Sequence, residues 1–95
     1  MDFEWDDDKA ASNWKKHGVR FAEAATIWQD DNAMEMPDPE HSESEERWVR
    51  MGFSRKARVL TVVYIEKVEN DRVRIISART ATRKEYEQYH MRVSK

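Results

Sequence analysis

The sequence predicts an α+β fold: a single domain in which an antiparallel sheet of about four to five strands is covered by two helices from its amino-terminal part and one carboxyl-terminal helix. One early segment has helix caps, the next has helical periodicity, and a series of β-branched and aromatic runs separated by short turns follows Glu46. A capping motif comes after these runs. Because 95 residues normally build one core, we expect one domain over residues 1–95.

The amino-terminal elements are a short strand and two helices. Residues 3–5 alternate apolar and acidic side chains, which indicates a strand. Asp6 is a favourable N-cap, and the cationic run Lys15–His17 before Gly18 is typical of a helix end, so we predict a helix over residues 7–17. A second short helix follows, because apolar residues recur at helical spacing: Phe21, Ala24, Ala25 and Trp28.

The remaining elements are strands and one final helix. Asp30-Asp31-Asn32 stops the second helix, residues 33–36 are expected to form an edge strand, and Pro37-Asp38-Pro39 forces a turn into an acidic loop. Antiparallel strands are predicted for three runs, which are 48–53, 59–67 and 72–78. Thr82 and Glu85 have capping-box spacing and open a last helix, which carries Tyr86, Tyr89, His90 and Val93 on one side.

Charge is divided unequally along the chain. Residues 1–46 carry 4 basic and 14 acidic side chains, whereas residues 47–95 carry 13 basic and 5 acidic ones. Arginine dominates the second half, and its guanidinium suits bidentate phosphate contact. Two interpretations are compatible: the halves attract each other across one fold, and the second half presents a phosphate-binding surface.

Several classes of site and location are disfavoured. The absence of cysteine excludes disulfides and thiolate zinc sites, and the three histidines His17, His41 and His90 form no metal-ligand pattern, so we expect no metal and no cofactor. With only two glycines there is no phosphate-binding loop of an NTPase, and no serine-hydrolase elbow is present. The longest apolar run, residues 62–65, is far too short to cross a membrane, and Met1-Asp2-Phe3-Glu4 does not begin a secretory signal, so we expect a cytoplasmic location.

The strand over residues 72–79 carries three arginines. The two-residue period predicts Arg72, Arg74, Ile76 and Ala78 on one face and Val73, Ile75, Ser77 and Arg79 on the other. Arg79 at the strand end and Arg83 in the first turn of the next helix are candidates to hold a phosphate. The alternative is that Arg79 pairs with a loop carboxylate such as Glu46 and that Arg83 is a solvated surface residue.

Other candidates depend on the neighbouring strand and on the helix ends. Arg50, which shares its strand face with Trp48, is expected on the sheet surface presented by Arg74, where arginine and an aromatic ring suit RNA. The alternative interpretation, which is the commoner case, is that Arg50 is an exposed arginine without a ligand. His17 is either a helix-capping residue or a proton-transfer group, and His90 is a candidate for a hydrogen-bonded core position.

Three stretches together resemble the BrnT family of bacterial type II toxins. The first contains Trp5-Asp6, Lys9, Asn13, Lys16-His17-Gly18-Val19, Phe21 and Glu23-Ala24. The second contains Asp38-Pro39, His41-Ser42 and Glu46-Arg47, and the third contains Arg74-Ile75-Ile76-Ser77-Ala78-Arg79, Ala81, Glu85 and Tyr89. Their order and spacing make the resemblance specific over nearly the whole chain.

The resemblance implies a RelE-like fold and an endoribonuclease that halts translation. It also implies a BrnA-like antitoxin with a ribbon-helix-helix DNA-binding element, with which the toxin would repress transcription, so RNA and this antitoxin are the expected partners. No membrane partner is expected.

A ribonuclease without metal must promote attack of the 2′-OH on the adjacent phosphorus. On that mechanism we expect Arg50, Arg74, Arg79 and Arg83 at phosphates, Lys16 and His17 in proton transfer or phosphate contact, Glu46 and Tyr89 in positioning, and Trp48 against a base. The alternative is a non-catalytic module that binds nucleic acid or protein through the same basic surface. An enzyme acting on a small anionic metabolite is a further alternative, although no cofactor loop is recognisable.

Overall fold

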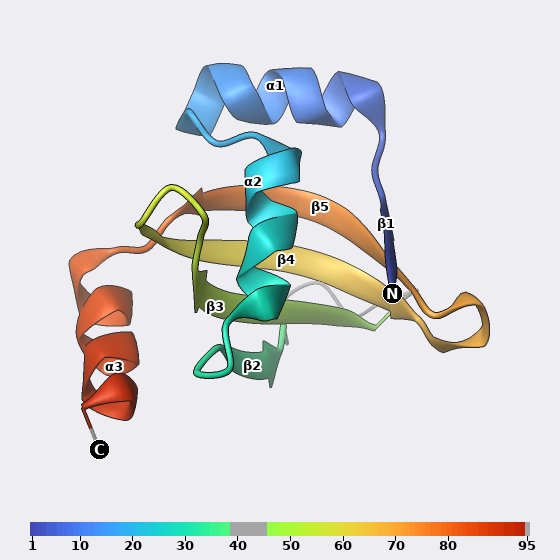
Figure 1. The fold of residues 1–95 in the computed structure, drawn as a ribbon. Helices are drawn as coiled ribbons and strands as arrows, with labels where there is room; N and C mark the ends of the chain where they lie inside the picture. Colours follow the sequence, from blue (N-terminus) through green and yellow to red (C-terminus); the bar gives the residue numbers. More distant parts are fainter. Residues whose placement is uncertain (39–45, 95) are drawn as a thin grey trace.

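A five-stranded sheet lies at the centre of the computed structural model, which describes residues 1–38 and 46–94 (Figure 1). The strand order is β1-β5-β4-β3-β2, and neighbours are antiparallel except for the parallel pair β1–β5. The strands are β1 (Asp2–Glu4), β2 (Met34–Pro37), β3 (Arg47–Phe53), β4 (Val59–Lys67) and β5 (Arg72–Thr80). The predicted α+β class is confirmed, and the first strand adds a parallel edge to the antiparallel sheet.

Helices surround this sheet on one face, at one edge and at one end. They are α1 (Asp7–His17), α2 (Phe21–Ala25) with the 3₁₀ turn η1 (Thr26–Gln29), the 3₁₀ turn η2 (Val68–Asn70), and α3 (Arg83–Val93). In Figure 1, α1 lies beside β5, α2 and η1 cross one face of the sheet, and α3 follows β5 toward the opposite edge. We call the face under α2 and η1 the covered face and the other the open face.

Local sequence signals explain where α1 begins and ends. The Asp6 carboxylate accepts a hydrogen bond from the Lys9 backbone N–H at 3.0 Å, which satisfies one of the free donors of the first turn. Gly18 ends the helix with φ 66° and donates its backbone N–H to the Trp14 carbonyl. A left-handed backbone is easy only for glycine, so the predicted bounds of residues 7–17 are confirmed.

The core fills the space between the covered face and α2–η1. Leu60, Val62 and Tyr64 of β4 and Val73, Ile75 and Ala78 of β5 are buried there, together with Val19, Phe21, Ala24 and Ile27. Gly52 of β3 permits this close packing, because a Cβ at that position would lie 2.9 Å from the Cβ of Ile27. The predicted apolar stripe of the second helix is therefore the core stripe.

A β-bulge in β5 changes which arginines share a face. Val63 pairs with Ser77 and Tyr64 with Ile75, which leaves Ile76 as an extra residue on β5. The side-chain alternation therefore shifts by one at Ile76. Arg72 and Arg74 lie on the open face with Ser77 and Arg79, and the prediction that Arg74 and Arg79 occupy opposite faces is wrong.

Asn13 joins α1 to the part of β5 that β1 is too short to reach. Its side-chain amide donates to the carbonyls of Val19 at 2.9 Å and Ala78 at 2.8 Å, and its side-chain oxygen accepts the Ala78 N–H at 3.1 Å. Asn13 thus pairs with both backbone groups of Ala78 as a strand neighbour would. This contact fixes the position of α1 relative to the bulge.

Candidate functional site

The open face carries a row of polar side chains along β5. Arg74, Ser77 and Arg79 point to this side, and because same-face residues repeat about every 7 Å along a strand, Arg74 and Arg79 lie roughly 13 Å apart. Val63 of β4 lies next to Ser77 and is half-buried, so the surface between the two arginines is apolar in part. The bulge is what creates this row.

Arg79 is held by a bidentate ion pair with Glu85 of α3. Its Nη1 lies 2.6 Å from Oε1 and its Nη2 lies 3.0 Å from Oε2 of that carboxylate. The pair therefore uses the Nη1–Nη2 end of the guanidinium and leaves the Nε–Nη2 side as a second donor edge. The side chain of Arg79 is 41% exposed, so this second edge can meet a ligand from solvent.

Glu85 receives further donors from β4 and from the N-cap of its own helix. The Thr61 hydroxyl of β4 donates to Oε1 at 3.1 Å, and the Thr82 backbone N–H donates to the same oxygen at 2.8 Å. The hydrogen bonds from Arg79, with those from Thr82 and Thr61, outweigh partial burial and lower the pKa of Glu85 to about 2. Glu85 is therefore ionised at neutral pH.

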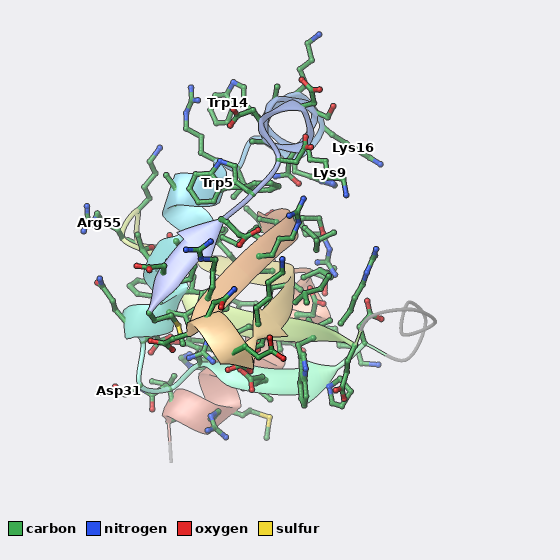
Figure 2. The ribbon with its side chains drawn as sticks, turned by 90° about the vertical axis from the view of Figure 1, so that its right-hand side faces the viewer. Trp5, Lys9, Trp14, Lys16, Asp31 and Arg55 are labelled. Carbon is green, nitrogen blue, oxygen red and sulfur yellow. The ribbon has the colours of Figure 1, made fainter. Side chains whose placement is uncertain are left out.

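A shallow groove of about 330 Å³ lies between α1 and the bulge of β5. Its lining includes Lys9, Lys16 and His17 of α1 with Ile76 and Ser77 of β5. In Figure 2, Lys9 and Lys16 project from the side of α1 opposite to Trp5 and Trp14. The two predicted residues Lys16 and His17 thus border the arginine row through Ser77.

A second group of charges lies at the other end of the open face. Arg74 pairs with Glu4 of β1 at 3.0 Å, and Lys67 and Arg72 lie 3.7 Å and 3.5 Å from the same carboxylate. Arg47 occupies this end as well, because it pairs in register with Ile65, which pairs with Arg74. Three cations thus surround the single carboxylate of Glu4.

The expected partnership of Arg50 with Arg74 is wrong, because Arg50 lies on the covered face. The strand register places Arg50 beside Val62 and Glu35, and its guanidinium is 2.8 Å from the Glu35 carboxylate and 5.0 Å from the centre of the Trp28 ring. Trp48 points to the same covered face and packs partly against the core. Parity within β3 pairs Arg50 with Trp48 correctly, but only the register between strands decides which face they share.

Two further residues predicted for the site, Tyr89 and Glu46, lie outside the arginine row. Tyr89 is buried, and its hydroxyl donates to the Asp30 carboxylate. Burial, together with this hydrogen bond, raises the pKa of the phenol. Glu46 is exposed just before β3, at the opposite end of the sheet from Arg79, so the alternative pairing of Arg79 with Glu46 is replaced by the pair with Glu85.

Arg83 is almost fully solvated and lies 3.3 Å from Glu87, one turn along α3. His90 is exposed and stacks on Tyr86, with ring centroids 6.0 Å apart, so the core position considered for it is not observed. His41 and Ser42 lie outside the described residues.

Some residues of this surface have little signal in the sequence. Ser77 and Lys9 belong to common surface types, and Glu85 is recognisable only by its capping-box spacing. The bulge has a clearer signal: Arg72 and Arg74 fall at even positions, whereas Ser77 and Arg79 fall at odd positions. Such a change of phase within one strand indicates an inserted residue.

Residues 1–38 and 46–94 contain no group of three or more histidine, aspartate or glutamate side chains placed to hold a metal ion. Within the same residues, no helix has the length and apolar character needed to cross a membrane.

Comparisons with known proteins agree on one family. Residues 5–85 match the model of the ribonuclease toxin BrnT of type II toxin-antitoxin systems. The crystal structure of the Brucella abortus ribonuclease toxin BrnT is similar to this chain with a TM-score of 0.67 and 24% sequence identity, over 87% of this chain and 99% of that one. At this identity the likeness shows a shared fold. No curated protein sequence matches the chain.

Proposed function

The chain belongs to the BrnT family of ribonuclease toxins of type II toxin-antitoxin systems, and from this premise we propose that its open face binds and cleaves RNA by metal-independent attack of a ribose 2′-OH. The observation that carries the proposal is the bulge at Ile76. It places Arg74, Ser77 and Arg79 in one row beside the groove that Lys16 and His17 line.

The reaction requires charge stabilisation at one phosphate and two proton transfers. The 2′-oxygen forms a bond to phosphorus, the bond from phosphorus to the 5′-oxygen breaks, the 2′ proton leaves to a base and the 5′-oxygen gains a proton. The Nε–Nη2 edge of Arg79, which lies outside the ion pair with Glu85, is suited to the non-bridging oxygens of the scissile phosphate. The products are a 2′,3′-cyclic phosphate and a 5′-hydroxyl.

The remaining groups have supporting roles in this proposal. His17 and Lys16 at the groove transfer protons or contact the phosphate, and Arg74 and Arg83 bind phosphates on either side of the scissile one. Arg50 and Trp48 on the covered face and the buried Tyr89 instead stabilise the elements that carry the open face. Glu46 is too far along the sheet to position Arg79.

The proposed partner is a BrnA-like ribbon-helix-helix antitoxin that neutralises the toxin in the cytoplasm and, with it, represses transcription of their genes. The support for a protein antitoxin is the type II classification of the family. A small neighbouring gene for a ribbon-helix-helix protein would be the direct check.

A second candidate function is binding without cleavage. It is favoured by one observation: Arg74, Arg79 and Arg83 each already contact a carboxylate, namely Glu4, Glu85 and Glu87. A surface whose cations are neutralised in this way can bind a nucleic acid weakly without stabilising extra transition-state charge. Turnover separates the two functions.

The test is to incubate the purified chain with single-stranded RNA in the presence of EDTA and to identify the product ends. We expect cleavage to continue and to give 2′,3′-cyclic or 3′-phosphate ends. Cleavage that stops on chelation, or products with 3′-hydroxyl ends, would contradict the proposed mechanism. Binding with no cleavage would favour the second candidate.

A further inference from the structure

Glu85 connects three elements at the end of the arginine row. Its carboxylate contacts Arg79 of β5, Thr61 of β4 and the backbone N–H of Thr82 at the start of α3. The Thr82 hydroxyl in turn accepts the Glu85 backbone N–H at 3.2 Å, which completes a capping box. The start of α3 and the orientation of the Arg79 guanidinium therefore depend on the same side chain.

This arrangement restricts a side chain that would otherwise move freely. A partly exposed arginine has many rotamers, and ordering it at the moment of binding has an entropic cost. The bidentate contact, with N–O distances of 2.6 and 3.0 Å, fixes the plane of the guanidinium and leaves its Nε–Nη2 edge outside the ion pair. The donor edge is thus oriented before a phosphate arrives.

Glu85 itself is poorly suited to accept a proton from RNA. Its Oε1 already accepts hydrogen bonds from Arg79, Thr61 and Thr82, and its pKa of about 2 lies far below the value that favours a general base near neutral pH. Its negative charge also opposes the approach of phosphate. An effect of Glu85 on cleavage must therefore operate through Arg79.

We propose that Glu85 is a positioning residue for RNA cleavage, acting through Arg79 by fixing the direction of its phosphate-binding edge. The inference rests on the proposed ribonuclease function. It predicts opposite effects on two steps: removal of the Glu85 charge strengthens or preserves RNA binding, because repulsion of phosphate is removed, but slows the chemical step, because the guanidinium is no longer oriented.

The variant that tests this is Glu85→Gln, since glutamine also completes capping boxes and so keeps the start of α3. We expect the single-turnover cleavage rate to fall by about 10²-fold, the size expected when a catalytic group is displaced by about 1 Å. The Kd for a non-cleavable RNA should stay equal or decrease. A thermal melt should remain cooperative.

The matched control is Glu87→Gln on the same helix, which makes the same charge change without touching Arg79. We expect its cleavage rate to stay within about threefold of that of the unsubstituted chain, since exposed charge changes have small effects. Equal losses in both variants would overturn the inference, because charge alone would then explain them.

A double substitution tests the route of action. If Glu85 acts through Arg79, Glu85→Gln has no further effect on the rate in an Arg79→Ala background. The same fold loss in both backgrounds would overturn the inference and leave the ribonuclease assignment intact. Failure of the unsubstituted chain to cleave RNA at all would instead overturn the proposed function, and this inference with it.

Discussion

Arg79 has two roles, one in the ion pair that links β5 to α3 and one in the proposed chemistry, and its substitution separates them. Arg79→Ala removes the donor edge for the scissile phosphate, so we expect cleavage to fall by about 10²–10³-fold, as when one transition-state donor is lost. The pair with Glu85 is partly exposed, so its loss should cost at most about 1 kcal/mol of stability. The measurements are growth arrest on expression, RNA cleavage by purified protein, and a thermal melt.

The prediction for Arg79→Ala would be contradicted if the variant lost cooperative folding to the same extent as cleavage activity. Such a loss would mean that the guanidinium mainly neutralises Glu85. Arg83→Ala is a suitable control because Arg83 lies in the first turn of α3, two residues before Glu85, and is almost fully solvated, so its substitution should weaken RNA binding only modestly and leave the melt unchanged.

Glu85 should also make stability depend on pH in the acid range. Hydrogen bonds from Arg79, then Thr82 and Thr61, hold its pKa at about 2, below its ordinary value of 4.5. Because the folded-state pKa is the lower one, the contribution of Glu85 to the free energy of unfolding is complete above pH 4.5 and is lost as the pH falls toward 2.

We therefore expect urea unfolding to show a larger loss of stability between about pH 5 and pH 3 for the unsubstituted chain than for Glu85→Gln. The comparison is needed because Glu23 and Asp30 have lowered pKa values too, and they titrate in both proteins. Identical pH profiles would show that Glu85 is not held by Arg79 in solution.

The hydrogen bonds of Asn13 hold α1 against β5 and so place Lys16 and His17 near Ser77. Asn13→Ala would leave the carbonyls of Val19 and Ala78 and the N–H of Ala78 without these partners in the interior. Because one unsatisfied buried group costs about 1–3 kcal/mol, we expect a loss of at least about 2 kcal/mol in the free energy of unfolding, measured by urea denaturation.

The control is Ser12→Ala on the exposed side of α1, which should change stability by less than about 0.5 kcal/mol. Equal stability of the two variants would contradict the assigned role of Asn13.

Most elements of the fold can be predicted from local sequence signals. The bounds of α1, β4 and the start of α3 follow from caps and from a β-branched and aromatic run between turns, which depend on neighbouring residues only. The face of Arg50 cannot be predicted in this way, because it depends on the register of β3 against β4 and β5. The same is true of the Arg79–Glu85 pair, in which geometry rather than spacing selects the partner.

The oppositely charged halves of the chain form ion pairs with each other inside the fold. Acidic residues of the first half pair with basic residues of the second: Glu4 with Arg74, Glu23 with Arg58, and Glu35 with Arg50. The attraction between halves that the sequence suggests is therefore present. Arg79 and Arg83 differ, because their partners Glu85 and Glu87 belong to the basic half as well.

The size of the open face decides whether RNA and an antitoxin can bind it together. Strands of up to nine residues at about 3.3 Å per residue, in a sheet with about 4.8 Å between neighbours, give a face of roughly 20 × 30 Å, or about 600 Å². Each partner of a stable protein complex buries about 800 Å². An antitoxin seated on this face would thus cover nearly all of it.

We therefore expect RNA and antitoxin to compete. A partner over Arg74 and Arg79 must bring carboxylates or displace Glu4 and Glu85, and association between opposite charges weakens with salt. The measurement is release of antitoxin from the preformed complex during titration with a non-cleavable RNA, repeated at several salt concentrations. Competition should appear as a mutual loss of affinity at every salt concentration, with both affinities falling as salt rises. Simultaneous binding without mutual loss would place the antitoxin on another surface and refute occlusion of the open face, while leaving the ribonuclease proposal standing.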